Sequence, residues 1–260
     1  LIYAHWIMPQ GIVAFAISRS MGVPYLLQNH SSDLSVFTKA RAPGRGLARR
    51  ILYGAEAFFC VNSDQAAFAR SLAPDLEPNV LPMGVSLDLD LAAGPQTHEP
   101  RFSVGTIARL SRKKGVHHLI DAAETLSEPH RPLSVGIAGD GEEAPALRDR
   151  PRLSDCHFTG FLSGGRKAAF FGDCRTMAFP SVEEQGDVEG LPVALLEALA
   201  AGKPVLASAA TNIRLLPEWA EIRDDVELIE DPADTRAFAA ALARLLDLPE
   251  TDARDRSDRL

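Results

Sequence analysis

The chain is 260 residues long, enough for one large or two modest domains with cores of their own. Its formal net charge of -8 at pH 7 argues against a general nucleic-acid binder, because such proteins are normally basic. Cys60, Cys156 and Cys174 lie far apart without metal-binding spacing, so we expect reduced thiols and a cytoplasmic location. No apolar run reaches membrane-spanning length.

The first 90 residues alternate strand-like and helix-like segments. We expect strands at 2–5, 23–28, 57–61 and 79–82, and helices at 10–21, at about 45–53 and after Ser63 as N-cap. This alternation predicts a parallel α/β sheet. The chain opens inside a strand-like segment and closes in a polar one, so we expect a fragment of a longer protein whose first domain is incomplete.

Residues 91–100, LAAGPQTHEP, have the composition of a linker between domains. From 101 to 260 the alternation starts again. Strands are expected at 102–107, 133–138, 157–160, 176–180, 204–208 and 226–229, and helices notably at 115–126 and 192–201. Six such strands predict a complete doubly wound sheet, which binds ligands at the carboxyl ends of its strands.

The stretch from Asp187 to Pro204 combines two carboxylates with an apolar helix. Pro192 suits the first helical position and Gly202 the residue after the end, with Glu197 as the one charge between them. Glu189 comes eight positions before Glu197, so the two could span roughly 12 Å along the element at 1.5 Å per residue. A helix N-terminus between them would suit phosphate. The alternative is a solvated Glu197 and an acidic loop.

A basic loop follows the strand expected at 102–107. Four cations precede the next helix: Arg109, Arg112, Lys113 and Lys114. A strand end that leads into a helix N-terminus is where a diphosphate binds, and these cations would strengthen that binding. A solvated basic loop is the alternative.

The sequence EGLPVALLEALAAGKPV, with its E-x7-E spacing, and the Arg109–Lys114 pair resemble the retaining nucleotide-sugar glycosyltransferases of family 4. Those enzymes have the GT-B fold, in which two Rossmann-like domains face each other across a cleft. The resemblance therefore implies an α/β chain of two doubly wound Rossmann-like domains. Residues 1–90 would be the incomplete acceptor-side domain, and residues 101–260 the domain that binds the nucleotide sugar.

The resemblance also implies roles for individual residues. Arg109 and Lys114 would clamp the donor diphosphate and stabilise it as it leaves. Glu189 would accept hydrogen bonds from the donor sugar, and Glu197 from the ribose. The remaining donor contacts would come from a phosphate-capping segment, a glycine turn of A-G-D-G type and a nucleobase loop: Gly190, Leu191, Pro192 and Val193; Gly139 and Gly141; Phe161 and Leu162. An ordinary turn and a packing phenylalanine are the alternatives for the last two groups.

His30 follows the strand expected at 23–28 and opens a polar loop. The family has a histidine here that touches the donor sugar near its anomeric centre, although Ser31 replaces the usual glycine. A capping or core histidine is the alternative. His5 also matches a family position, which would face the acceptor side.

The implied reaction moves a sugar from a UDP- or GDP-type donor to a hydroxyl of a glycan or lipid-linked acceptor, as in polysaccharide, lipopolysaccharide or glycolipid biosynthesis. It implies no cofactor and no metal. Residues 210–215, ATNIRL, depart from the family's Gly-Gly-x-Pro-Glu turn near the donor phosphate. A non-catalytic sugar-nucleotide-binding protein is therefore an alternative. Another GT-B enzyme, such as a nucleotide-sugar epimerase, is a second alternative. No G-x-G-x-x-G follows a strand, which disfavours a dinucleotide-dependent oxidoreductase.

A second basic cluster lies between Thr38 and Ala55, a stretch without acidic residues. It could attract a phosphorylated lipid acceptor or the anionic inner face of a membrane, giving peripheral membrane contact. A solvated helix and loop would look the same in sequence. The cluster comprises Lys39, Arg41, Arg45, Arg49 and Arg50.

Overall fold

The computed structural model describes residues 1–30, 42–85, 99–127, 132–150, 154–184 and 189–248. By their contacts, Leu1–Met83 and a short segment that ends at Leu191 form a first unit, and the remaining residues form a second. Most of the stretch expected to be a linker, with Lys39, Arg41 and Ser31, lies outside the described residues.

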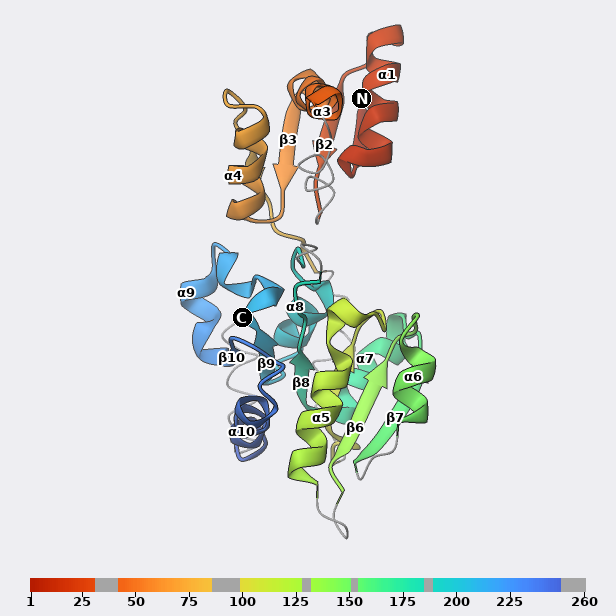
Figure 1. Ribbon diagram of the computed structural model, residues 1–260, viewed down its shortest axis with the longest axis vertical. Helices are drawn as coiled ribbons and strands as arrows, with labels where there is room; N and C mark the ends of the chain where they lie inside the picture. Colours follow the sequence, from red (N-terminus) through yellow and green to blue (C-terminus); the bar gives the residue numbers. More distant parts are fainter. Residues whose placement is uncertain (31–41, 86–98, 128–131, 151–153, 185–188, 249–260) are drawn as a thin grey trace. The chain divides into compact units, whose positions relative to one another are not determined.

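The first unit is built on a parallel four-stranded sheet of order β1-β2-β3-β4, with the strands in chain order. Figure 1 labels β2 and β3 of this sheet. Helical segments connect successive strands, as the alternation predicted. Side chains of the strands and of α3 form the core, where Tyr25, Leu27 and Phe58 are buried. The elements are β1 Ile2–His5, η1 Ile7–Gly11, α1 Ile12–Met21, β2 Tyr25–Gln28, α3 Ala42–Gly54, β3 Ala57–Cys60, α4 Ser63–Leu72 and β4 Asn79–Val80.

The helices expected at 10–21 and at about 45–53 begin at Ile12 and Ala42, and the N-cap expected for α4 was wrong. Asn62, not Ser63, is the N-cap of α4, because its side chain accepts a hydrogen bond from the backbone N–H of Gln65 at 2.9 Å. Ser63 is the first helical residue. Asparagine caps a helix as well as serine does, so composition alone could not separate the two neighbours.

The second unit contains a parallel six-stranded sheet of order β10-β9-β8-β5-β6-β7. All six expected strands are present, with starts shifted by one or two residues at four of them. The strands are β5 Phe102–Ile107, β6 Ser134–Ala138, β7 Asp155–Gly160, β8 Cys174–Phe179, β9 Val205–Ser208 and β10 Val226–Ile229. The helical segments are η3 Arg112–Lys114, α5 Val116–Leu126, α6 Ala144–Asp149, α7 Gly164–Asp173, α8 Val193–Ala200, η4 Ala209–Thr211, η5 Ile213–Leu215, α9 Trp219–Ile222, η6 Arg223–Asp225 and α10 Thr235–Leu246.

The core of the second unit lies between its sheet and two helices that pack on each other, α5 and α10. Val104, Leu119, Ile137, Phe238 and Leu242 are fully buried there. Both helices carry apolar residues three and four apart, which places those side chains on one face. This packing holds the strands in place, so the loops at their carboxyl ends start from a rigid base.

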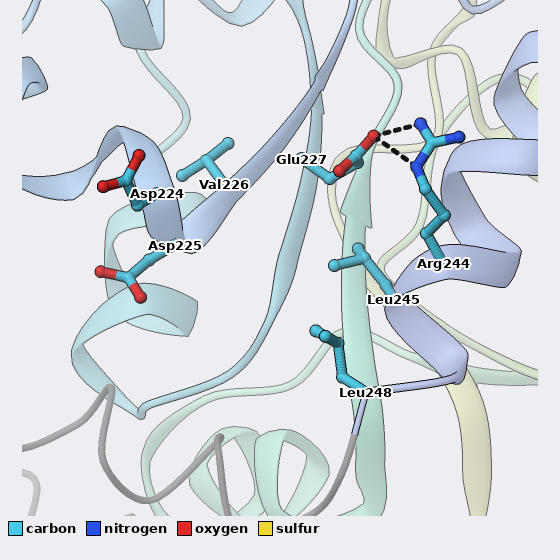
Figure 2. Close-up of a pocket in the computed structure, with 7 residues that line it drawn as sticks. All are labelled: Asp224, Asp225, Val226, Glu227, Arg244, Leu245 and Leu248. Carbon is cyan, nitrogen blue, oxygen red and sulfur yellow. Dashed lines mark hydrogen bonds and ion pairs between the residues drawn. The ribbon is translucent and has the colours of Figure 1, made fainter.

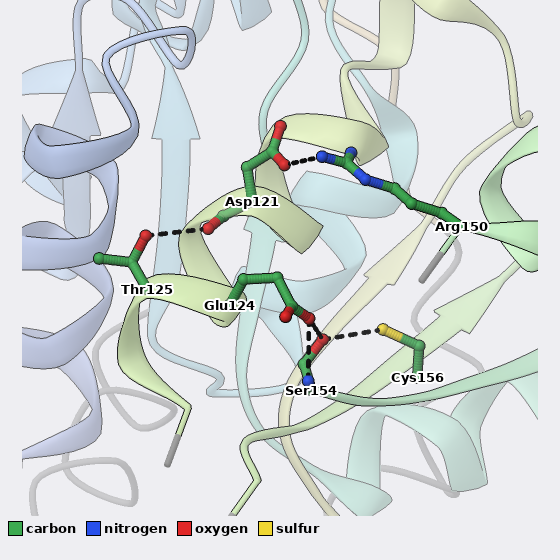
Figure 3. A network of polar contacts seen from close by, with 6 residues as sticks. All are labelled: Asp121, Glu124, Thr125, Arg150, Ser154 and Cys156. Atoms are coloured by element: carbon green, nitrogen blue, oxygen red, sulfur yellow. Dashed lines mark hydrogen bonds and ion pairs between the residues drawn. The ribbon is translucent and has the colours of Figure 1, made fainter. Parts of the chain in front are cut away.

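A polar network fastens α5 to the chain just before β7 (Figure 3). The Arg150 guanidinium pairs with the Asp121 carboxylate. The Glu124 carboxylate accepts hydrogen bonds from the backbone N–H of Ser154, at 2.8 Å, and from its hydroxyl. These contacts fix the edge of the sheet at β7.

Candidate functional site

The six-stranded sheet reverses its direction of growth between β5 and β8. From β5 the chain adds β6 and β7 on one side, and then β8, β9 and β10 on the other. Loops that leave two such neighbouring strands diverge, and ligands of doubly wound sheets bind in the resulting crevice. Residues 108–115 leave β5 here, and the chain that follows Phe179 leaves β8. The basic loop predicted from sequence therefore lies at the switch point of the sheet.

Backbone contacts join the two loops at this point. The N–H of Val182 donates to the carbonyl of Lys113 at 2.8 Å. Gly115 has φ +63°, and a Cβ on it would lie 1.9 Å from the carbonyl oxygen of Pro180. Glycine is thus required twice, for the left-handed backbone and for the close approach. Lys114, the residue before it, ends the short η3 turn and is half-buried.

The turn after β6 packs directly under the basic loop. A Cβ on Gly139 would lie 1.8 Å from the carbonyl oxygen of Ala108, and one on Gly141 would lie 2.4 Å from that of Leu110. The N–H of Leu110 donates to the carbonyl of Asp140 at 2.9 Å. Gly139 and Gly141 therefore support the loop that carries Arg109, a packing role that was not part of the sequence prediction. Contact of these glycines with a ligand stays a prediction.

Arg109 reaches from this loop to Glu142. Its guanidinium lies 3.2 Å from the Glu142 carboxylate, and the two side chains are 75% and 57% exposed. A hydrogen bond from its own backbone and the Arg109 charge lower the pKa of Glu142. The guanidinium that we expect to bind diphosphate is thus already paired with a carboxylate. Sequence reasoning missed Glu142, although it stands next to Gly141 at the same edge of the sheet.

The loop after β7 presents an aromatic ring to solvent. Phe161 is 73% exposed, and Leu162 beside it is half-buried. Gly160, with φ +73°, turns the chain out of the strand. Such exposure contradicts the alternative of a packing phenylalanine, and it leaves the ring face available for stacking. A nucleobase contact remains a prediction.

Helix α8 begins one residue later than expected. Pro192 is its N-cap, with extended backbone, and Val193 is its first residue. Gly202 has φ +66° just past the end of the helix, as predicted. Leu195, Ala198 and Leu199 are buried, whereas Glu197 is partly exposed and pairs with Lys167 of α7. No pattern in the sequence indicates this partner, because it comes from another helix.

In the first unit, the two predicted histidines meet at the carboxyl ends of β1 and β2. His5 Nδ1 lies 2.7 Å from His30 Nε2, and His30 Nδ1 lies 3.1 Å from the sulfur of Met83. Since a thioether only accepts, the Nδ1–H of neutral His30 points to Met83, and its Nε2 accepts from His5. Burial, and then the charge of His5, lower the pKa of His30. The lowered pKa favours the neutral imidazole of His30.

The described part of the segment before α8 contacts the first unit. Asn62, which caps α4, also donates from its side-chain amide to the carbonyl of Gly190 at 3.2 Å. Gly190 and Leu191 are buried, and Glu189 is partly exposed. Arg109, Lys114 and Glu197 belong to the second unit, whereas His30, Glu189, Gly190 and Leu191 belong to the first. Asp187 lies outside the described residues.

The departure at 210–215 forms two short turns, η4 and η5, around Asn212. Asn212 has φ +58°, a left-handed conformation that asparagine tolerates better than most residues. The Thr211 hydroxyl donates to the carbonyl of Ser208 at 2.7 Å, and Ile213 is buried. The turn is therefore well anchored despite its different sequence.

A pocket of about 240 Å³ lies elsewhere in the second unit (Figure 2). Its walls come from the start of β10 and the end of α10, including Asp225, Glu227 and Arg244. Because β10 begins at Val226, this pocket is at the amino ends of the strands, the edge opposite the switch point. It has no part in the predicted donor site.

The described residues contain no group of three or more histidine, cysteine, aspartate or glutamate side chains placed to hold a metal ion. Within the same residues, no helix combines the length and apolar character needed to span a bilayer. Independence from metal stays a prediction.

Curated relatives match this chain. TuaC of Bacillus subtilis, named as a teichuronic acid biosynthesis glycosyltransferase, is 25% identical over 253 residues, which cover 94% of this chain and 60% of TuaC. The amylovoran biosynthesis glycosyltransferase AmsK of Erwinia amylovora is 31% identical over 173 residues, which cover 64% of this chain and 41% of AmsK. The chain thus spans less than two thirds of the length of these relatives.

Solved structures share the fold. Anabaena HepE, crystallised with UDP, matches with a TM-score of 0.72 and 19% identity, covering 99% of this chain and 72% of HepE. The UDP-forming trehalose-phosphate synthase of Burkholderia xenovorans matches with a TM-score of 0.72 and 15% identity, covering 100% of this chain and 68% of the synthase. This protein therefore has the α/β architecture with parallel sheets of GT-B proteins, as the sequence predicted.

The second unit, which contains the basic loop, the glycine turns and α8, also matches a protein family. A family model described as glycosyl transferases group 1 matches residues 101–248. That span is more than half of the 260 residues, so the chain belongs to the glycosyl transferases group 1 family.

Proposed function

We propose that this protein acts as a retaining glycosyltransferase, which moves a sugar from a nucleoside-diphosphate donor to a hydroxyl acceptor in polysaccharide, lipopolysaccharide or glycolipid biosynthesis. The observation that carries the proposal is the basic loop at the β5–β8 switch point, held in place by Gly115, Gly139 and Gly141. The names of TuaC and AmsK support a role in polysaccharide biosynthesis, and the UDP complex of HepE supports a UDP-type donor.

In this proposal, the second unit binds the nucleotide half of the donor. Arg109 and Lys114 bind the diphosphate and offset the charge that develops on it as the sugar–phosphate bond breaks. Two cations can supply this stabilisation without a metal ion. Glu197 accepts hydrogen bonds from the ribose, and the exposed ring of Phe161 stacks on a uracil or guanine base.

Retention follows from the roles proposed for the carboxylates. Glu189 binds the donor sugar and Glu197 the ribose, so neither is available as a nucleophile for double displacement. The leaving phosphate then takes the proton of the acceptor hydroxyl on the same face of the sugar. His30 contacts the sugar as a neutral imidazole. Trapping of a covalent glycosyl-enzyme would refute this mechanism.

We also propose that the acceptor is a glycan or a lipid-linked glycan met at the cytoplasmic face of a membrane. Arg45, Arg49 and Arg50 are exposed on α3, and their charges would attract anionic headgroups. Flotation of the chain with anionic vesicles, but not with neutral ones, would support this contact. Equal recovery with both kinds would contradict it.

The first experiment is a titration of the whole chain with UDP, GDP, ADP and NAD. We expect one nucleoside diphosphate to bind selectively. Arg109→Ala should weaken it by more than tenfold, because charge-assisted hydrogen bonds to phosphate are lost. Arg112→Ala, which removes an exposed cation from the same loop, is the matched control and should change affinity by less than about threefold. If the folded chain binds none of the four, the proposal is wrong.

The turn at 210–215 favours a second candidate, a protein that binds the sugar nucleotide without turnover. Its Asn212-centred geometry lies near the position where the resemblance places the donor phosphate. An assay that mixes the bound nucleotide sugar with glycan acceptors separates the two candidates. Product with the donor's anomeric configuration, read by NMR, supports the transferase, and tight binding without product supports the second candidate.

A further inference from the structure

Lys167 and Glu197 form an ion pair between α7 and α8. Lys167 Nζ contacts Oε2 of Glu197, and the side chains are 25% and 24% exposed. Oε2 itself is shielded from solvent and has no hydrogen-bond partner of suitable geometry, so the contact is ionic. Glu197 is the only charge in α8, which the structure describes in full and whose sequence is VALLEALA.

A shielded carboxylate on an apolar helix depends on a counter-charge. Without one, the carboxylate would be an unpaired charge shielded from water, which favours a rotamer that reaches solvent. Lys167 supplies that charge. It engages Oε2 and leaves Oε1 as the oxygen that can accept hydrogen bonds from a ligand. One lysine thus fixes the orientation of the Glu197 carboxylate.

Both residues lie close to the edge of the sheet that carries the donor site. Lys167 is the fourth residue of α7, which starts soon after Phe161 at the carboxyl end of β7. Glu197 is the fifth residue of α8, in the connection between β8 and β9. Each residue of the pair therefore lies about one helical turn after the start of its helix, next to the loops that would hold the nucleoside.

We propose that Lys167 is a positioning residue that makes the donor site selective for ribose. It holds the Glu197 carboxylate so that Oε1 accepts from the ribose hydroxyls, and a deoxyribose cannot replace these hydrogen bonds. This inference rests on the proposed role of Glu197 in nucleotide binding. A lysine that only ties two helices together would affect stability but not the choice of sugar.

The test compares UDP and GDP with their 2′,3′-dideoxy counterparts, titrated into the whole chain by calorimetry. The wild type should prefer the ribose form of its nucleotide by about 10-fold to 100-fold, as expected for hydrogen bonds to a charged group. In Lys167→Met this preference should fall below about threefold, while the affinity for the dideoxy form stays unchanged. Lys167→Arg should restore most of the preference.

The adjacent Arg166 provides the matched control. It is exposed, so Arg166→Met removes the same charge from α7 and should keep the full preference. If Lys167→Met retains the wild-type preference, the inference is wrong even though the donor site is real. A wild type that binds no nucleoside diphosphate would instead overturn the proposed function. Should Lys167→Met fail to fold, Lys167→Gln, which keeps a polar side chain without the charge, replaces it: the inference requires Lys167→Gln to lose the preference, and a retained preference would overturn it.

Discussion

Replacement of Gly115 by alanine tests the packing of the switch point. Gly115 and Gly160 have similar backbones, with φ +63° and φ +73°, but only the Cβ of residue 115 would meet the backbone of Pro180, at 1.9 Å. Nothing lies within 4 Å of a Cβ at residue 160. Gly160→Ala therefore reports the cost of a left-handed alanine by itself, about 1–2 kcal/mol.

Gly115→Ala carries the same backbone cost and a steric conflict in addition. Relief of such overpacking costs about 1–3 kcal/mol more, so we expect a total loss of about 2–5 kcal/mol. Urea unfolding followed by circular dichroism measures both variants in the same unit. Because the clash would also displace the chain next to Lys114, Gly115→Ala should weaken nucleoside diphosphate binding under conditions where it is still folded. Equal losses of stability in the two variants would refute the close approach described here.

Three further predictions concern charge. Burial lowers the pKa of Lys203 from 10.5 to about 8, so its ammonium destabilises the fold below pH 8 and this cost disappears as pH rises to 10.5. Lys203→Met should therefore raise the free energy of unfolding at pH 7, by up to about 3 kcal/mol, with no gain near pH 10.5; a gain that does not change with pH would contradict this origin. Glu142→Gln frees the Arg109 guanidinium and should tighten nucleoside diphosphate binding by up to about fivefold, since an exposed pair contributes up to about 1 kcal/mol; weaker binding would show that Glu142 helps to hold the ligand. By NMR, His30 should titrate below the usual histidine range. His5→Gln should raise the pKa of His30, because a nearby positive charge is removed; an unchanged His30 pKa would leave burial as the whole cause.

The sequence predicted the strands well because each is short, apolar and bounded by turn residues. The positions of Val226–Ile229 and Phe102–Ile107 were found to the residue. Helix starts were less certain, because neighbouring residues such as Asn62 and Ser63 have similar capping chemistry. Local sequence decides where a helix can begin, and the tertiary contacts of the cap decide between adjacent candidates.

In the candidate site, too, local sequence indicated some residues, whereas tertiary contacts determined others. Arg109, Lys114 and the glycines could be located because they follow strands, and the carboxyl ends of parallel strands share one edge. Glu142 and Lys167 could not, because their partners are distant in sequence and the pairing depends on how loops and helices pack. The support that Gly139 gives to Ala108 was invisible for the same reason.

The Arg109–Glu142 pair affects both the salt dependence of nucleotide binding and the release of product in the proposed enzyme. A diphosphate that binds Arg109 would have to replace the Glu142 carboxylate, because the guanidinium is already paired. Added salt screens both the incoming phosphate and the internal carboxylate, so affinity should depend less on ionic strength than the number of cations suggests. After transfer in the proposed mechanism, the same carboxylate would compete with the product nucleoside diphosphate for the guanidinium. The Glu142 carboxylate would thereby shorten the residence time of the product nucleotide and favour turnover.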